Sequence, residues 1–95
     1  MKWFRCLIKG ENFPGALVNS DKLIGFYTTR CVEAETYEEA EMKALASLKN
    51  EESLQLPVGL VPPNTAKVYF EEIIEIMESE VPEVNAGFSF YVMGT

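Results

Sequence analysis

Few residues in this chain are of the types that most often carry chemistry. There are two cysteines, Cys6 and Cys31, and no histidine. A Ser-His-Asp or Cys-His site needs an imidazole as its base, so the sequence offers neither. A structural zinc ion needs four good ligands, and two separated cysteines do not provide them. We therefore expect a protein that is not an enzyme, with no catalytic residue, no metal site and no cofactor.

The two cysteines have different neighbours. Cys6 alternates with Phe4 and Ile8, so we expect a buried thiol that packs as a small apolar side chain. Cys31 follows Arg30, whose charge could lower the pKa of the thiol, although no base or motif supports a nucleophilic role. Two thiols could form one disulfide, but they do not make a disulfide-dense secreted scaffold.

Two acidic runs resemble carboxylate clusters that could hold a metal ion or act as a paired acid and base. Adjacent carboxylates on a helix or strand do not converge on one point, so we expect both runs to be solvated. The runs are Glu38, Glu39 and Glu41, and Glu71, Glu72 and Glu75.

The stretch GENFPG at positions 10–15 raises the question of a phosphate-binding loop. It lacks the glycine spacing, the lysine and the following helix that such loops require. Pro14 and Gly15 instead suit the centre of a type II turn, in which glycine supplies a positive φ. We expect a wide hairpin loop with turns at 10–21.

The net charge of the chain indicates which classes of partner it can bind. Fifteen acidic and eight basic residues give a net charge of −7. Binding to nucleic acid depends on basic residues that neutralise phosphates, so we expect none. Such binding would need Arg5, Lys9, Arg30 and Lys67 on one surface. The acidity suits a basic protein partner or serves solubility.

Ninety-five residues, 47% of them apolar, predict a single domain over 1–95 with one small core. A dimer would bury further surface, and we expect a homodimer. The N-terminus is interrupted by Arg5 and Lys9 and does not resemble a signal peptide, and no apolar run approaches the ~18 residues of a membrane span. We expect a cytoplasmic protein without membrane contact.

Two alternating segments predict strands over 2–10 and 22–35. In the first, Phe4, Cys6 and Ile8 share the face that we expect to be buried. In the second, neither face is cleanly apolar. A bulge near Gly25 or Thr28 would shift the alternation and restore an apolar face. One face carries Ile24, Phe26, Thr28, Arg30, Val32 and Ala34, and the other carries Leu23, Tyr27, Thr29, Cys31 and Glu33.

The segment 36–50 predicts a helix. Thr36 and Glu39 form a capping box, and Glu39 and Lys43 form an i,i+4 ion pair. Asn50 can end the helix. The apolar stripe consists of Tyr37, Ala40, Ala44, Leu45 and Leu48.

The rest of the chain predicts an apolar loop over 50–65, a strand over 66–76 and a strand over 87–93. In the strand over 66–76 we expect Val68, Phe70, Ile74 and Ile76 to face inward. The alternative for this region is a second helix over 68–79. The predicted fold is α+β, with an antiparallel sheet in the order ββαββ and one main helix on one face.

The best candidate surface for binding is the outer face of the sheet. Trp3, Arg5, Tyr27 and Thr29 would lie together there if residues 5 and 29 were paired, and a Trp-Arg-Tyr group is typical of interaction hot spots. We expect a small, acidic, non-catalytic interaction or regulatory domain that self-associates. The alternative is a ligand-binding or weakly enzymatic cleft between loop 10–21 and loop 50–65, with contacts from Asn12, Phe13 and Arg30.

One segment also carries a resemblance. The stretch FYTTRCVEAETYEEAEMKALASL, a strand followed by a capped helix with a stripe of Ala and Leu, is similar to the strand-helix segment of HicB-type antitoxin domains. The FPG at 13–15 resembles their Pro-Gly turn, although here it precedes the second strand, and no DNA-binding extension follows the helix. The overall pattern is also similar to short bacterial proteins of no assigned function. The resemblance implies a protein-neutralising role.

Overall fold

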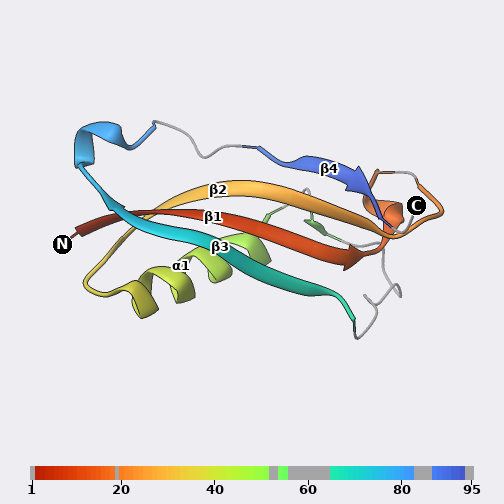
Figure 1. The fold of residues 1–95 in the computed structure, drawn as a ribbon, viewed down its shortest axis with the longest axis horizontal. Coiled ribbons are helices and arrows are strands. Elements are labelled where there is room, and N and C mark those ends of the chain that lie inside the picture. Colours follow the sequence, from red (N-terminus) through yellow and green to blue (C-terminus); the bar gives the residue numbers. More distant parts are fainter. Residues whose placement is uncertain (1, 19, 52–53, 56–64, 83–86, 94–95) are drawn as a thin grey trace.

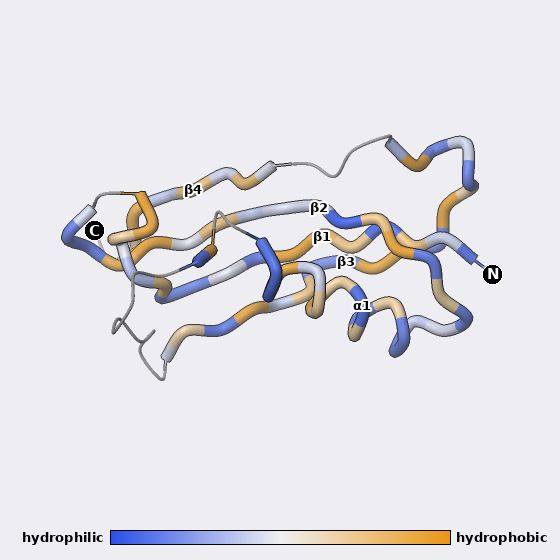
Figure 2. Tube along the Cα trace, turned by 180° about the vertical axis from the view of Figure 1, so that it is seen from behind, coloured by the Kyte–Doolittle hydropathy of each residue, from blue (hydrophilic) through white to orange (hydrophobic). Residues whose placement is uncertain are grey.

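The computed structural model describes residues 2–18, 20–51, 54–55, 65–82 and 87–93. In chain order its elements are β1 (Lys2–Phe13), β2 (Ile24–Ala34), α1 (Tyr37–Lys49), β3 (Lys67–Ile76) and β4 (Ser89–Val92). The strands form one antiparallel sheet in the order β3-β1-β2-β4, and α1 lies along one face of it (Figures 1 and 2). The predicted α+β fold with the order ββαββ is confirmed.

Residues 67–76 form a strand, so the alternative of a helix over 68–79 is wrong. A bulge interrupts this strand: Leu7 of β1 is opposite Glu72, but the next residue, Ile8, is opposite Phe70. Glu71 is thus an extra residue in β3. The alternation of its residues between the two faces of the sheet therefore reverses at this point. Val68, Phe70 and Ile73 pack on the core, whereas the expectation that Ile74 and Ile76 face inward is wrong.

The first hairpin also departs from strict alternation, but not where the sequence suggested. β2 alternates without a break, and its inward residues from Ile24 to Ala34 are buried or half-buried. The irregularity lies in β1 between Gly10 and Phe13, opposite Gly25. There Asn12 adopts a positive φ of 61°. Asparagine tolerates this conformation better than most residues, so it can carry the extra residue of the bulge.

The loop after β1 is a short 3-10 helix, Gly15–Val18, and not the predicted type II turn. The φ of Gly15 lies outside the left-handed region. A Cβ at this position would collide with the carbonyl oxygens of Ser20 and Lys22, and the amide of Ser20 donates to the Gly15 carbonyl at 2.8 Å. Glycine is therefore needed because the loop folds closely back on itself.

The helix begins and ends where its capping residues predict. The amide of Glu39 donates to Oγ1 of Thr36 at 3.1 Å, which satisfies one of the free amides of the first turn. At the other end, the amide of Asn50 donates to the Ser47 carbonyl. Glu39 also forms the predicted ion pair with Lys43, at 3.3 Å.

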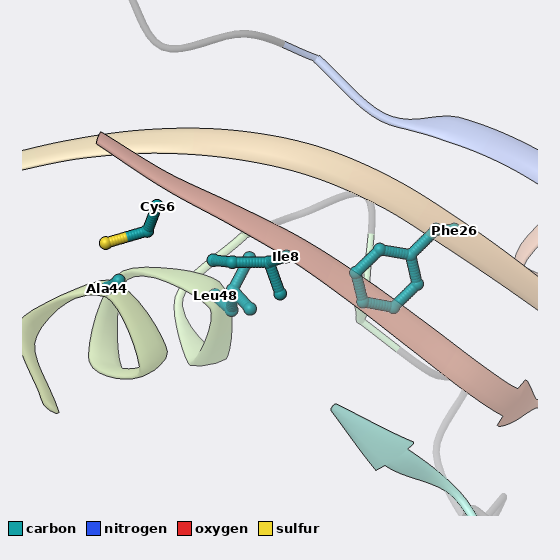
Figure 3. Packing of buried hydrophobic residues seen from close by; sticks show 5 residues of the cluster. All are labelled: Cys6, Ile8, Phe26, Ala44 and Leu48. Atoms are coloured by element: carbon teal, nitrogen blue, oxygen red, sulfur yellow. The ribbon is translucent and has the colours of Figure 1, made fainter. Parts of the chain in front are cut away.

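The core lies between α1 and the inward face of the sheet (Figure 3). Ala40 and Ala44 are fully buried, and their small side chains let the helix lie close to the strands. Tyr37, at the start of the predicted stripe, is 52% exposed, but its ring lies edge-on to Phe4 with centroids 4.9 Å apart. The main cluster consists of Cys6, Ile8, Phe26, Ala44 and Leu48.

One charged residue, Arg30, is buried next to this core. Arg30 points to the helix side of the sheet and is only 2% exposed. Its Nη1 donates to Oε1 of Glu51 at 2.7 Å, just beyond the end of α1. Its guanidinium also lies 5.1 Å from the ring centroid of Phe88, an arrangement that favours a cation–π interaction. Burial of a cation is unfavourable without such partners.

This arrangement predicts unequal effects for the two halves of the ion pair. Glu51→Ala leaves the Arg30 charge buried without its carboxylate, so we expect a loss of about 3 kcal/mol in the free energy of unfolding. Arg30→Met removes the charge and keeps much of the volume, so we expect a smaller loss. The measurement is urea unfolding followed by circular dichroism.

The control is Glu39→Ala, which removes an exposed ion pair of α1 and should cost no more than about 0.5 kcal/mol. A larger loss for Arg30→Met than for Glu51→Ala would mean that packing of the arginine stem, and not its charge, dominates.

Candidate functional site

The face of the sheet that points away from α1 is the candidate site, and we call it the outer face. Strand pairing places on it alternate residues of β1, β2 and β3, together with Tyr91 of β4. No described helix or strand lies over it (Figures 1 and 2). Its uncharged members with large side chains are Trp3, Leu7, Tyr27, Tyr69, Ile74, Ile76 and Tyr91.

The predicted group of Trp3, Arg5, Tyr27 and Thr29 shares this face but does not form one patch. Arg5 is opposite Cys31 and not Thr29, so the expected pairing is wrong by two residues. A shift of two preserves the face of every side chain. Tyr27 is opposite Lys9, six residues from Trp3 along β1, which is roughly 20 Å.

One half of the outer face carries four large apolar side chains among charged neighbours. Ile76 is opposite Trp3, and Ile74 is opposite Arg5, with Leu7 two residues further along β1. All four apolar side chains are half-buried. We call Trp3, Leu7, Ile74 and Ile76 the apolar end.

The other half is aromatic and contains a fixed cation. Lys9 lies between Tyr27 and Tyr69 on the neighbouring strands. Its Nζ is 3.1 Å from Oε1 of Glu11 and 5.6 Å from the ring centroid of Tyr27. Hydrogen bonds to Glu11 and Tyr27 raise the pKa of Lys9, so the ammonium is held in its charged form.

The ring of Tyr91 lies beside that of Tyr27, with centroids 5.6 Å apart and planes 32° apart. A Cβ at Gly25, its cross-strand partner, would collide with the Tyr91 ring. The missing side chain of Gly25 thus lets the ring lie close over the backbone of β2. Burial raises the pKa of Tyr91, while Lys9 opposes the shift.

The outer face is balanced in charge. Pairing places three basic and three acidic side chains on it, so these six sum to zero (3 − 3), whereas the chain as a whole carries −7. The net negative charge therefore belongs to the other surfaces. The six are Arg5, Lys9, Lys67, Glu11, Glu33 and Glu72.

The predicted loop contacts are separated. Asn12 donates through Nδ2 to the Thr65 carbonyl at 3.2 Å, and Phe13 packs edge-on to Phe26. Arg30 lies in the interior with Glu51. It therefore does not share the outer face with Arg5, Lys9 and Lys67, and the arrangement required for a nucleic-acid surface is not met.

A cavity does exist between loop 10–21 and the part of loop 50–65 that the structure describes. Its volume is about 410 Å³. The remainder of the predicted cleft, at 52–53 and 56–64, lies outside the described residues. The lining is mostly apolar and consists of Phe13, Leu48, Lys49, Leu54, Gln55 and Val68.

The cysteines lie on opposite faces of the sheet, and both thiols are free. Burial raises the pKa of Cys6 to about 11. Burial also raises the pKa of Cys31, and Arg5, not Arg30, opposes that shift. Arg30 does not lower the pKa of Cys31, because the neighbouring residue in a strand points to the other face.

The acidic runs lie on the surface, as their spacing suggested, with most of their members exposed. Within the described part of the chain, no three His, Cys, Asp or Glu side chains are placed to hold a metal ion. Of the helices in the same part, none has the length and apolar character needed to cross a membrane.

Comparison with protein-family models, with curated proteins and with solved structures finds no match to this chain. Its function is therefore inferred from the geometry of the described residues.

Sequence reasoning missed several members of the outer face. Ile74 and Ile76 were assigned inward because the Glu71 bulge has no local signal. Tyr69 could have been found from its alternation with Val68 and Phe70. Tyr91 could have been found only by pairing its strand with Gly25, since a glycine within a strand often marks a close approach.

The raised thiol pKa values predict slow alkylation. At pH 8 we expect iodoacetamide to modify Cys31 more slowly than free cysteine and Cys6 only after unfolding, because both thiols stay protonated. Mass spectrometry of timed samples measures both rates. Alkylation of Cys31 faster than that of free cysteine would contradict this prediction and would indicate an activated thiol.

The same shift at Cys6 makes stability depend on pH. In the unfolded chain this thiol ionises near its ordinary pKa of 9.0, whereas in the folded chain it ionises near 11. The stabilising contribution is complete below pH 9 and is lost as the pH rises through 11. Urea unfolding at pH 8 and pH 10.5 should show a lower free energy of unfolding at the higher pH.

Proposed function

We propose that this protein is a small, acidic, non-catalytic interaction domain that self-associates through the apolar end of its outer face. The observation that carries the proposal is the set of large apolar side chains on the side away from α1, with no described layer over them. An antiparallel sheet can leave one face in water, but such a face is usually polar. On this face, Trp3, Leu7, Ile74 and Ile76 instead gather large apolar side chains at one end.

Charge supports a second copy as the occupant. Two chains of −7 repel each other in general, but the charged side chains that pairing places at the apolar end, Arg5, Glu33 and Glu72, sum to only −1 (1 − 2). Two apolar ends can therefore approach with little net repulsion. A two-fold dimer uses the same patch on both copies, which suits a patch that carries both signs of charge.

The acidity of the remaining surface supports a second role, in which a basic protein binds the dimer. This role matches what the resemblance to HicB-type domains implies, and it stays a prediction, as does a cytoplasmic location. It would involve the exposed glutamates of α1 and not the outer face.

A small-molecule site is the second candidate, supported by the cavity of about 410 Å³ near the end of α1. Its lining by Phe13, Leu48, Leu54 and Val68 favours an apolar ligand. Native mass spectrometry of the protein purified from its own cells would reveal such a ligand. Leu54→Trp, which fills the cavity, should abolish binding of this ligand.

Self-association is tested by light scattering of the purified chain. We expect twice the 10.7 kDa mass of one chain. Trp3→Ala and Ile74→Thr should each weaken the dimer by about tenfold or more, because they remove apolar area from the centre of the interface. Threonine keeps a β-branched side chain, so strand formation is preserved.

The matched control is Met42→Ala, which removes a large apolar side chain that is 72% exposed on α1. It should leave the native mass unchanged. A wild-type protein that stays monomeric at high concentration, or a dimer that resists both outer-face variants, would contradict the proposal.

A further inference from the structure

The aromatic half of the outer face has no role in association through the apolar end alone. Tyr69 and Tyr27 lie on either side of Lys9 on three neighbouring strands, and Tyr91 lies beside Tyr27. Tyr27 and Tyr69 are 40% and 42% exposed, and no described helix or strand lies over this half (Figures 1 and 2). We call Tyr27, Tyr69 and Tyr91 the tyrosine row.

The size of the apolar end indicates that it is only part of a contact between two copies. The molecule measures 42 × 21 × 20 Å, with its strands along the longest axis (Figure 1). A long face is therefore roughly 850 Å² in projection, of which the apolar end takes about half. Specific interfaces bury about 800 Å² on each partner, whereas chance contacts in crystals mostly bury less than about 400 Å² on each. Only the whole outer face reaches the size that a stable dimer needs.

Face-to-face packing of two sheets also extends a contact along the strands. Sheets that stack in this way keep their strands within about 30° of each other. β1 runs through both halves of the outer face, with Trp3 and Leu7 at the apolar end and Lys9 in the aromatic half. Two copies whose β1 strands are aligned can therefore cover both halves at the same time.

The charges of the two halves compensate each other. The charge of the apolar end is −1, and that of the aromatic half is +1 (2 − 1), the latter from Lys9, Lys67 and Glu11. A contact confined to the apolar end sets −1 against −1. A contact over the whole outer face is neutral on each copy, so electrostatic complementarity favours the larger one.

The polar groups of the aromatic half already have partners within the chain. The Nζ of Lys9 lies 3.1 Å from Oε1 of Glu11 and 5.6 Å from the ring centroid of Tyr27. The hydroxyl of Tyr91 donates to the Gly10 carbonyl at 3.5 Å. A second copy can thus cover this half without leaving the ammonium unpaired, which is the arrangement that makes a buried charge most unfavourable.

We propose that the interface between two copies covers the whole outer face, with the tyrosine row as its second half. The proposal rests on the self-association proposed above, and it assigns that contact its extent and a further set of residues. Tyrosine is enriched in protein–protein interfaces, because its ring buries a large area while its hydroxyl still reaches a partner. The apolar end supplies the most hydrophobic part of the contact, and the tyrosine row supplies the area that the apolar end lacks.

The test measures the dissociation constant of the dimer by analytical ultracentrifugation. Tyr27→Thr and Tyr69→Thr each remove a ring from the outer face and introduce a residue that favours strands. We expect each to raise the dissociation constant by about tenfold, while the far-UV circular dichroism stays native. The matched control is Val92→Thr on β4, where the side chain is 47% exposed but shares the helix side of the sheet with Ile24. It should leave the dissociation constant unchanged.

Chemical modification of the wild-type chain gives a readout that needs no variant. Tetranitromethane nitrates accessible tyrosine rings, and mass spectrometry of peptides locates the products. Tyr27 and Tyr69 should react several-fold more slowly at protein concentrations above the dissociation constant than below it. Tyr37, which is 52% exposed on the helix side, should react at the same rate at both concentrations.

The outcomes separate this proposal from the self-association on which it rests. A dimer that Trp3→Ala weakens and that both tyrosine variants leave intact would overturn the proposal and leave association through the apolar end standing. Equal nitration of Tyr27 and Tyr69 above and below the dissociation constant would have the same meaning. A wild-type chain that stays monomeric at high concentration would overturn both.

Discussion

The ion pair between buried Arg30 and half-buried Glu51 joins the sheet to the end of α1, which no backbone pairing links. Arg30 belongs to the centre of β2, Glu51 follows α1, and Phe88, on which the guanidinium stacks, precedes β4. A cation inside an apolar layer is unfavourable unless its partners are in place. One side chain therefore holds the residue that follows α1 and also packs on the segment that precedes β4. With the helix fixed on this side, the opposite face has no described layer over it.

Much of the fold follows from signals that are local in the sequence. The alternation of Phe4, Cys6 and Ile8 correctly assigned the buried face of β1, and the alternation of β2 correctly divided its residues between the two faces. Thr36 marked the start of α1, because capping depends only on the next three residues. The outer-face position of Trp3, Arg5, Tyr27 and Thr29 followed from the same alternation.

The remaining features depend on contacts between distant segments and could not be found in this way. The register of the hairpin pairs Arg5 with Cys31 and Lys9 with Tyr27, so Trp3 and Tyr27 fall in separate halves of the outer face. Arg30 was taken as a loop contact, since nothing near it in the sequence indicates Glu51 as its partner. Gly15 was assigned a turn conformation, whereas the approach of Ser20 and Lys22 explains it.

The extra residue at Glu71 has a consequence for the solubility of the folded chain. β3 is an edge strand of ten residues, and a long regular edge offers its free amides and carbonyls to strands of other molecules, which leads to aggregation. The bulge disrupts the regular edge at its middle, and Glu71 and Glu72 place carboxylates there. Uncontrolled growth of the sheet by edge-to-edge addition is thereby disfavoured. Contacts between molecules are directed to the faces of the sheet, where specific side chains decide what binds.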